Sequence, residues 1–285
     1  MIYFILFMLV LVVLQVIELR KFKVTPYLFS QEKINTSIKA VILADVHCKQ
    51  FPKRNKTLVD AIKNQKPEII FIPGDFVSCK NSKKFPISLA LMEELCHIAP
   101  VYYSFGNHEM RLYEQEHVNH REFMHYLKRV QLMGAIILNN ETAAIKIGSN
   151  PIVITGCNLP LEYYQKGKKT RLPQNVLNEL LPNTNEDAYS ILLAHNPAYM
   201  DNYVQWGADL ILCGHNHGGL VRIPWFGSFI SPEFQFHPQY DGGIYFFGEQ
   251  KAIVSKGLGT HTFHIRIFNR AELISVQIDC SNQKQ

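Results

Sequence analysis

Three features are missing from this sequence of 285 residues: internal repeats, low-complexity segments and cysteines at paired spacings. Their absence argues against repeat architectures, compositionally biased chains and small disulfide-stapled scaffolds. With 47% hydrophobic residues, the composition is that of a globular protein with a sizeable core. The cysteines fit a reducing compartment better than an oxidising one, although their even number leaves disulfides open. They are Cys48, Cys79, Cys96, Cys157, Cys213 and Cys280.

A basic stripe is also missing. The formal net charge of +5 suits anionic substrates or a membrane surface. A nucleic-acid-binding protein would gather its Lys and Arg residues on one face, with aromatic stacking positions among them. Here the basic residues are scattered, so we expect no nucleic-acid partner. The densest cluster is typical of a solvated loop and consists of Lys166, Lys168, Lys169 and Arg171.

One long hydrophobic run is present, at the N-terminus. Residues 1–17 are apolar except for Gln15, and about 17–25 apolar residues cross a bilayer. No Lys or Arg precedes the run and no small-residue cleavage site follows it, which argues against a cleaved signal peptide. The run also lacks the polar face of a helix packed on a soluble domain. We therefore predict a membrane anchor at residues 1–18.

The rest of the chain is predicted to contain one connecting segment and one domain. We predict a connecting segment at residues 19–36 and a single domain at residues 37–285, because no linker divides the latter. Arg20, Lys21 and Lys23 follow the anchor. The positive-inside bias therefore places the domain in the cytoplasm, at the cell membrane.

Short apolar runs alternate with amphipathic runs along the domain. The amphipathic runs predict helices at 55–65, 85–98 and 121–132. The apolar runs predict strands at 38–44, 69–72, 101–105, 145–147, 152–155, 190–194, 209–213, 252–255, 263–268 and 273–278. A turn at residues 148–151 joins the fourth and fifth of these strands as a hairpin. Buried strands flanked by helices predict a layered α/β domain in which both faces of the sheet are covered.

Five of the predicted strands are followed, at once or after one or two residues, by a polar side chain that can bind a metal. These residues are Asp45, Asp75, Asn107, His195 and His215. In open α/β sheets, ligands bind beyond the carboxyl ends of the strands, where loops from separate strands converge. We therefore expect these side chains to meet at one site.

The chemistry of the donors indicates divalent cations. The candidate ligands are Asp45, His47, Asp75, Asn107, His195, His215 and His217. Oxygen and imidazole donors suit Mn, Fe or Zn, and because this set is complete we do not expect Cys48, Cys79 or Cys213 to serve as thiolate ligands. A bridging carboxylate such as Asp75 can hold two cations about 3.5–4 Å apart, with a deprotonated water between them for displacement at phosphorus. His108 is placed to give a proton to the leaving oxygen.

The motif series resembles the calcineurin-like metallophosphoesterase superfamily over about residues 38–268. The motifs are Asp45-Val46-His47, Gly74-Asp75, Gly106-Asn107-His108-Glu109, Ala194-His195-Asn196 and Gly214-His215-Asn216-His217-Gly218-Gly219. The resemblance implies a central β-sandwich flanked by helices, which accommodates the strands of the C-terminal part. It also implies an enzyme that contains two divalent metal ions. We favour manganese and keep iron and zinc as alternatives.

The resemblance also implies a role for each residue. The first metal would be bound by Asp45, His47, Asp75 and His217. The second would be bound by Asp75, Asn107, His195 and His215, with Asp75 as the bridge. His108 would act at the leaving group. The catalytic residues that the resemblance implies are therefore His108, Asn107 and Asp75.

A narrower resemblance points to the bacterial membrane-associated branch of that superfamily. It is carried by the apolar N-terminus and by residues 214–219, 255–259 and 266–269. The branch includes phosphodiesterases and UDP-2,3-diacylglucosamine pyrophosphatases. Ala44 stands where many relatives have Ser, and Phe76-Val77-Ser78 lacks a second acidic residue, but neither departure removes a ligand.

Three functions remain open from the sequence. The first is hydrolysis of a small phosphodiester or pyrophosphate by a hydroxide that bridges two divalent metals. The second is a glycolipid pyrophosphatase of the UDP-2,3-diacylglucosamine type. The third is a non-catalytic, membrane-tethered scaffold, which predicts missing ligands, whereas none is missing.

The aromatic stretch at residues 223–236 has two interpretations. It follows the last candidate ligands and is rich in Pro and aromatic residues. A packed loop that covers the sheet is the simpler interpretation. The alternative is an apolar wall for a lipid tail or a contact with the membrane, because amphipathic aromatics favour the interface.

Overall fold

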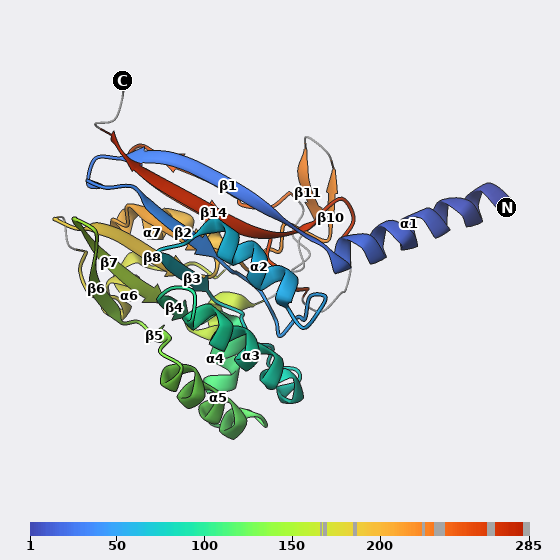
Figure 1. The fold of residues 1–285 in the computed structure, drawn as a ribbon, viewed down its shortest axis with the longest axis horizontal. Helices are drawn as coiled ribbons and strands as arrows, with labels where there is room; N and C mark the ends of the chain where they lie inside the picture. Colours follow the sequence, from blue (N-terminus) through green and yellow to red (C-terminus); the bar gives the residue numbers. More distant parts are fainter. Residues whose placement is uncertain are drawn as a thin grey trace.

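The computed structural model describes residues 1–165, 167, 170–184, 187–223, 226–230, 237–260 and 266–281. Two six-stranded mixed sheets pack against each other and helices cover their outer faces (Figure 1). The first sheet has the order β1 (Phe22–Gln31), β14 (Ala271–Cys280), β2 (Ile38–Ile42), β3 (Ile69–Pro73), β4 (Val101–Ser104) and β5 (Ile136–Leu138). The second has the order β12 (Gly243–Phe247), β13 (Gln250–Val254), β9 (Leu210–Cys213), β8 (Tyr189–Ala194), β7 (Asn150–Cys157) and β6 (Thr142–Ile147). The predicted β-sandwich flanked by helices is therefore confirmed.

The helices form the outer layers of the sandwich. Helices α2 (Lys56–Gln65), α3 (Phe85–Cys96) and α5 (His120–Leu132) pack on the first sheet, as predicted from their amphipathic runs. Helices α6 (Gln174–Leu180) and α7 (Met200–Trp206) pack on the second. The remaining elements are α4 (Asn107–Tyr113), the hairpin of β10 (Val221–Ile223) and β11 (Gly227–Ile230), and the short 3₁₀ helices at Ser82–Lys84, Leu161–Tyr164 and Pro197–Tyr199.

The apolar runs are continuous because each central strand is buried on both faces. In β2, Ala40 and Ile42 face the core between the sheets, while Val41 packs under the outer helices. In β8, Ile191 faces the inner core and Leu192 faces α6 and α7. Alternate residues thus enter different cores, which requires apolar residues at every position.

The segment predicted as a connection contains a strand. Residues 22–31 form β1, which pairs in parallel with β14 from Phe22–Ala271 to Gln31–Cys280. β1 is an edge strand, where Pro26 is tolerated because one side of the strand donates no ladder hydrogen bond. The interpretation of residues 19–36 as a simple connection was therefore wrong, and residues 22–31 belong to the sandwich.

Two smaller predictions differ from the structure. The β6–β7 hairpin is confirmed, but its loop is shorter than predicted, because Asn150 and Pro151 already pair with β6. The predicted strand at 263–268 falls partly on residues 263–265, which lie outside the described residues. Ile267 forms an isolated bridge with Val221. All six cysteines are free.

Helix α1 (Ile2–Arg20) projects from the body of the protein (Figure 1). It is long and apolar enough to cross a membrane, and none of its residues is buried against the domain. Two contacts hold its last turns to the domain. The Gln15 side-chain oxygen accepts a hydrogen bond from the Arg266 backbone N–H at 2.9 Å, and Glu18 pairs with Arg270 at 3.3 Å.

Candidate metal centre

All seven predicted ligands lie together, in the loops that follow five neighbouring strands. Asp45 follows β2, Asp75 follows β3, and Asn107 follows β4 as the first residue of α4. His195 and His215 follow β8 and β9 in the second sheet. Because parallel strands end at the same edge, both sheets deliver their loops to one place. None of the seven ligands is more than 8% exposed.

The ligand loops adopt a backbone that most residues avoid. Five of the seven predicted ligands have a positive φ: Asp45 (51°), His47 (49°), Asp75 (51°), His215 (70°) and His217 (49°). Such a conformation in a residue other than glycine costs about 1–3 kcal/mol and persists only where the surrounding structure enforces it. Here the loops hold each other, since the Asp45 N–H donates to Gly74 O at 3.2 Å and the His47 N–H donates to Asp75 O at 3.0 Å. Concentrated strain of this kind is typical of a functional site.

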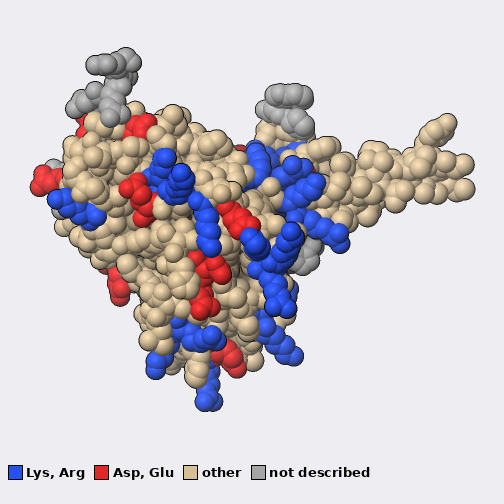
Figure 2. Space-filling model, viewed as in Figure 1, with Lys and Arg blue, Asp and Glu red and all other residues tan. Residues whose placement is uncertain are grey.

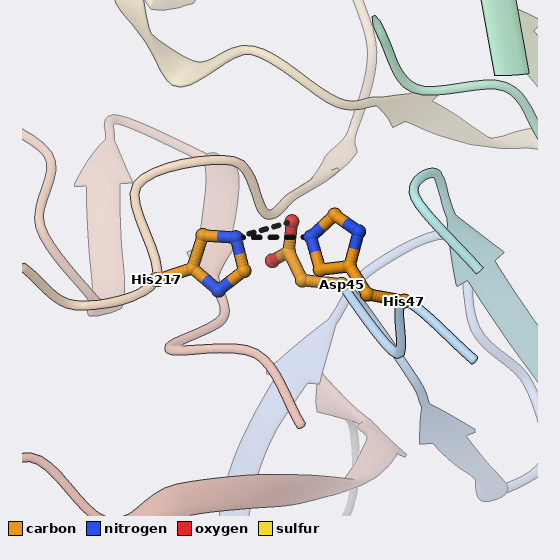
Figure 3. Close-up of side chains that lie close together, drawn as sticks. All are labelled: Asp45, His47 and His217. Carbon is orange, nitrogen blue, oxygen red and sulfur yellow. Dashed lines mark hydrogen bonds and ion pairs between the residues drawn. The ribbon is translucent and has the colours of Figure 1, made fainter. Parts of the chain in front are cut away.

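One group of donor atoms consists of Asp45, His47 and His217 (Figure 3). The Nε2 atoms of His47 and His217 lie 3.1 Å apart, and Nε2 of His217 lies 3.7 Å from Oδ1 of Asp45. The two imidazole rings stack with their centroids 5.0 Å apart. The donor atoms of this group all lie within 4.8 Å of one another, as the ligands of a single cation do.

A second group consists of Asp75, His195 and His215, again within 4.8 Å. Nε2 of His195 lies 3.1 Å from Oδ2 of Asp75. The same Oδ2 atom lies 3.8 Å from Nε2 of His47, in the first group. Asp75 therefore stands between the two groups, where one carboxylate can serve both.

Asn107 supplies an oxygen that the protein leaves without a partner. Its side chain is 4% exposed, and its Oδ1 atom has no hydrogen-bond partner among the described residues. A buried acceptor without a partner costs about 1–3 kcal/mol. A divalent cation would satisfy this oxygen, and the oxygen and imidazole donors around it suit such a cation. The residues present therefore fit the metals that the resemblance implies.

The surrounding contacts aim the ligands at the centre. Nδ1 of His195 donates to the carbonyl of Pro73 at 2.9 Å, which leaves Nε2 facing Asp75. Both carboxylate oxygens of Asp45 accept the backbone N–H of His215, at 3.0 and 3.1 Å. The Pro73 carbonyl thus fixes the tautomer of His195, which raises the affinity of that imidazole for a cation.

Glu109 connects the loops of the first sheet. Its carboxylate accepts the backbone N–H groups of Asp75 and Val77 at 2.9 Å and of Gly106 at 3.0 Å, and the Tyr103 hydroxyl at 2.7 Å. Burial, followed by the charge of Asp75, raises the pKa of Glu109 to about 7. In the sequence, Glu109 is only the last residue of the motif Gly106-Asn107-His108-Glu109. The structure shows that it holds the Asp75 loop against the start of α4.

His108 lies at the edge of the cluster with a defined tautomer. Its Nδ1 accepts the backbone N–H of Cys79 at 3.0 Å, so in the neutral ring the proton is on Nε2. Its own backbone N–H donates to Oδ1 of Asp75 at 2.9 Å. The imidazole also packs edge-on against His47, with the centroids 4.7 Å apart. His108 therefore presents an N–H group beside the two donor groups.

The pKa values of the predicted ligands are shifted by burial and by their charged neighbours. Burial disfavours a charged imidazole at His195, but the carboxylate of Asp75 outweighs burial and raises the pKa of His195 to about 10. Burial also raises the pKa of Asp45. At Asp75 burial acts in the same direction, yet His195 and His108 outweigh it and keep the pKa well below its ordinary value. Binding of cations here must therefore release protons.

Two residues of the C-terminal segment, Arg266 and Asn269, bind the backbone of loops beside the ligands. The guanidinium of Arg266, 1% exposed, donates to the carbonyls of Lys256, Gly257 and Gly259 at 2.8, 3.0 and 2.6 Å. The amide of Asn269 donates to the carbonyls of His217 and Gly219 at 2.7 and 2.6 Å. In the sequence, these residues carry only the narrower resemblance. In the structure they fix the backbone beside the ligands.

Gly257 gives a specific test of this support. Its φ is +68°, and a Cβ atom there would lie 2.8 Å from Cβ of Asp45. We expect Gly257→Ala to displace Asp45 and to weaken metal affinity about 10–100-fold, the usual effect of disturbing the support of a ligand. Isothermal titration with Mn²⁺ measures this change.

Gly248→Ala is the matched control. Gly248 has a φ of +63° and no atom within 4 Å of its notional Cβ. Both substitutions share the backbone cost, about 1–2 kcal/mol, but only Gly257→Ala touches a predicted ligand. Equal metal affinities for the two variants would contradict the positioning of Asp45 by this loop.

The fold and the site together define a class of protein. A β-sandwich that carries a buried Asp, Asn and His cluster beyond its strand ends is the architecture of a metallophosphoesterase, a hydrolase that acts on phosphoester bonds. The chain matches the family model described as calcineurin-like phosphoesterase over residues 38–219, more than half of its length. The chain therefore belongs to the calcineurin-like phosphoesterase family.

Two relatives found by sequence carry names that agree with this assignment. The chain is 26% identical over 244 residues to "Phosphodiesterase YaeI" of Escherichia coli K12, which covers 84% of this chain and 82% of the relative. It is 26% identical over 238 residues to "Uncharacterized metallophosphoesterase YkoQ" of Bacillus subtilis 168, with 83% and 82% covered. Among solved structures, the protein TT1561 of Thermus thermophilus aligns with 78% of this chain and 90% of its own, at a TM-score of 0.49 and 12% identity.

Proposed function

We propose that this chain is a membrane-anchored phosphodiesterase or pyrophosphatase that works with two divalent cations, of which manganese is the one we favour. The observation that carries the proposal is the pair of buried donor groups around Asp75, together with the partnerless Oδ1 of Asn107. Asp45, His47, Asp75 and His217 would hold one cation. Asp75, Asn107, His195 and His215 would hold the other.

Each residue then has a defined task. When bound, the two cations activate water and neutralise the charge that develops on the phosphorus oxygens. Asp75 would contribute to holding both cations, because its carboxylate faces both donor groups. His108 donates its Nε2 proton to the leaving oxygen, since its Nδ1 already accepts the Cys79 N–H. Burial of the cluster strengthens these electrostatic interactions by excluding water.

The chain would work at the cytoplasmic face of the cell membrane. Helix α1 supplies the anchor, and Arg20, Lys21 and Lys23 follow it on the side of the domain. A substrate with a small phosphodiester or pyrophosphate group would reach the metal centre from the water or from the lipid surface. A glycolipid pyrophosphate, such as a UDP-acylated sugar, is the second candidate substrate. It is favoured by the exposed aromatic side chains of the β10–β11 hairpin near the base of α1.

A metal analysis combined with a substrate panel tests the proposal. The full-length protein in detergent should contain two Mn²⁺ ions per chain by plasma mass spectrometry. It should cleave bis-p-nitrophenyl phosphate and at least one of a nucleotide diester, a UDP-sugar and a UDP-diacylglucosamine. Fully loaded protein that cleaves no diester, monoester or pyrophosphate would instead support the non-catalytic scaffold.

A further inference from the structure

We propose that the β10–β11 hairpin is a second membrane-contacting surface, which lies on an anionic lipid bilayer beside α1. The surface, named here the hairpin face, consists of Ile223, Phe226, Phe229 and Phe268. The inference rests on the proposed membrane anchoring by α1.

The hairpin face exposes large apolar side chains. Phe226 is 78% exposed and Phe268 is 59% exposed, and Ile223 and Phe229 are 40% and 42% exposed. A loop that only covered the sheet would turn such side chains inward. Exposed aromatics gathered in this way mark an interaction site rather than a solvated surface. Pro224 and Trp225 lie outside the described residues.

The hairpin face is continuous with the base of α1. Phe268 stands between Arg266, whose N–H donates to Gln15, and Arg270, which pairs with Glu18. β10 is joined to the same segment, because Val221 bridges to Ile267 and the Arg222 N–H donates to Ile267 O at 3.0 Å. Figure 1 shows the hairpin beside the point where α1 leaves the body. A bilayer crossed by α1 therefore meets the hairpin.

The charge of this region suits an anionic surface. Arg20, Lys21, Lys23 and Arg270 all lie where α1 joins the domain. Figure 2 shows that Lys and Arg side chains gather around this junction, while α1 itself carries almost none. Basic residues beside an apolar face are the usual combination in proteins that lie on anionic membranes.

Beside the exposed apolar side chains, the hairpin face contains a cavity that is lined partly by polar residues. A cavity of about 500 Å³ lies between the hairpin and the following segment, lined by Arg222, Phe226, His237, Asp241 and Phe268. Arg222 and Asp241 pair at 3.0 Å on its wall. An apolar rim around a polar hollow matches the boundary between acyl chains and headgroups, where aromatic side chains settle.

Photocrosslinking of the full-length protein in vesicles tests the contact. Benzoylphenylalanine is placed at Phe226 or Phe268, and the vesicles contain phosphatidylethanolamine and phosphatidylglycerol. The control position is Leu132, which is 79% exposed and is the last residue of α5. Helix α5 lies at the bottom of the body in Figure 1, away from the hairpin. We expect lipid adducts from positions 226 and 268 at several times the yield from position 132. Replacing phosphatidylglycerol with phosphatidylcholine should lower that yield at least about five-fold, because the basic residues lose their attraction.

Carbonate extraction of the same samples separates this proposal from the anchoring. Protein that resists carbonate but gives equal yields at positions 226, 268 and 132 would overturn the hairpin contact and leave the anchor intact. Adducts at positions 226 and 268 from protein that carbonate removes would support the hairpin contact and show that α1 does not span the bilayer. Removal without adducts overturns both.

Discussion

Replacing Asp75 with Asn is expected to reduce kcat/KM about a thousand-fold and to lower the metal content below two ions per chain. The amide keeps the shape of the carboxylate and can still accept the His108 N–H, so the fold should persist. It loses the negative charge that faces both donor groups, through Oδ2 at 3.1 Å from His195 and 3.8 Å from His47. Metal ions supply several kcal/mol of charge stabilisation in the transition state, and each 1.4 kcal/mol is a factor of ten in rate.

Asp209→Asn is the control for this substitution. Asp209 is also a partly buried carboxylate, which accepts the Ser190 N–H at 2.8 Å and pairs with Lys33 at 3.0 Å. It lies at the opposite end of β8 and β9 from the cluster. We expect normal metal content and normal rate for this variant. An Asp75→Asn protein with both metals and an unchanged rate would show that our assignment of the site is wrong.

The second large effect is expected from His108→Asn. We expect kcat to fall about 10²–10⁴-fold on a substrate with an alkoxide leaving group, the usual contribution of a general acid. The loss should be far smaller with p-nitrophenolate, which leaves without a proton. The asparagine oxygen can still accept the Cys79 N–H, which keeps the loop in place. Metal content should stay at two ions per chain, because His108 is not one of the seven predicted ligands.

The dependence on the leaving group distinguishes proton donation from a loss of structure. A purely structural role for His108 would lower the rates of both substrates equally. His120→Asn serves as the control, since the His120 ring contacts the Leu112 carbonyl at 3.1 Å outside the cluster. If His108→Asn slows both substrates to the same extent, His108 positions the loop and another group gives the proton.

The ligand loops could be predicted from the sequence because a single rule placed them. Each central strand is apolar on both faces, so its end is visible as the point where the apolar run stops at Asp45, Asp75 or His195. Parallel pairing then brings these ends to one edge. The β-sandwich itself followed only from the resemblance, since apolar runs do not reveal which strands share a sheet.

The elements that were missed depend on contacts between distant residues. β1 is only partly buried and contains Pro26, so it carries no strong strand signal, and its pairing partner lies about 250 residues away. Glu109 accepts hydrogen bonds from the backbone of the Asp75 loop, on the preceding strand end, and Arg266 donates to the nearer backbone carbonyls of Lys256, Gly257 and Gly259. Backbone partners leave no pattern in the sequence, so neither role could be predicted.

The hydrogen bond between Gln15 and Arg266 gives α1 a consequence beyond attachment. Gln15 is the single polar residue in the apolar run, and it binds the same segment whose guanidinium supports the loop beside Asp45. Together with the Glu18–Arg270 ion pair, this hydrogen bond fixes the last turns of α1 to the domain. With α1 in a bilayer, as we propose, the domain would be held against the membrane surface. For the second candidate substrate, a glycolipid, encounters with the metal centre would then be a search in two dimensions, set by the number of molecules per unit of membrane area.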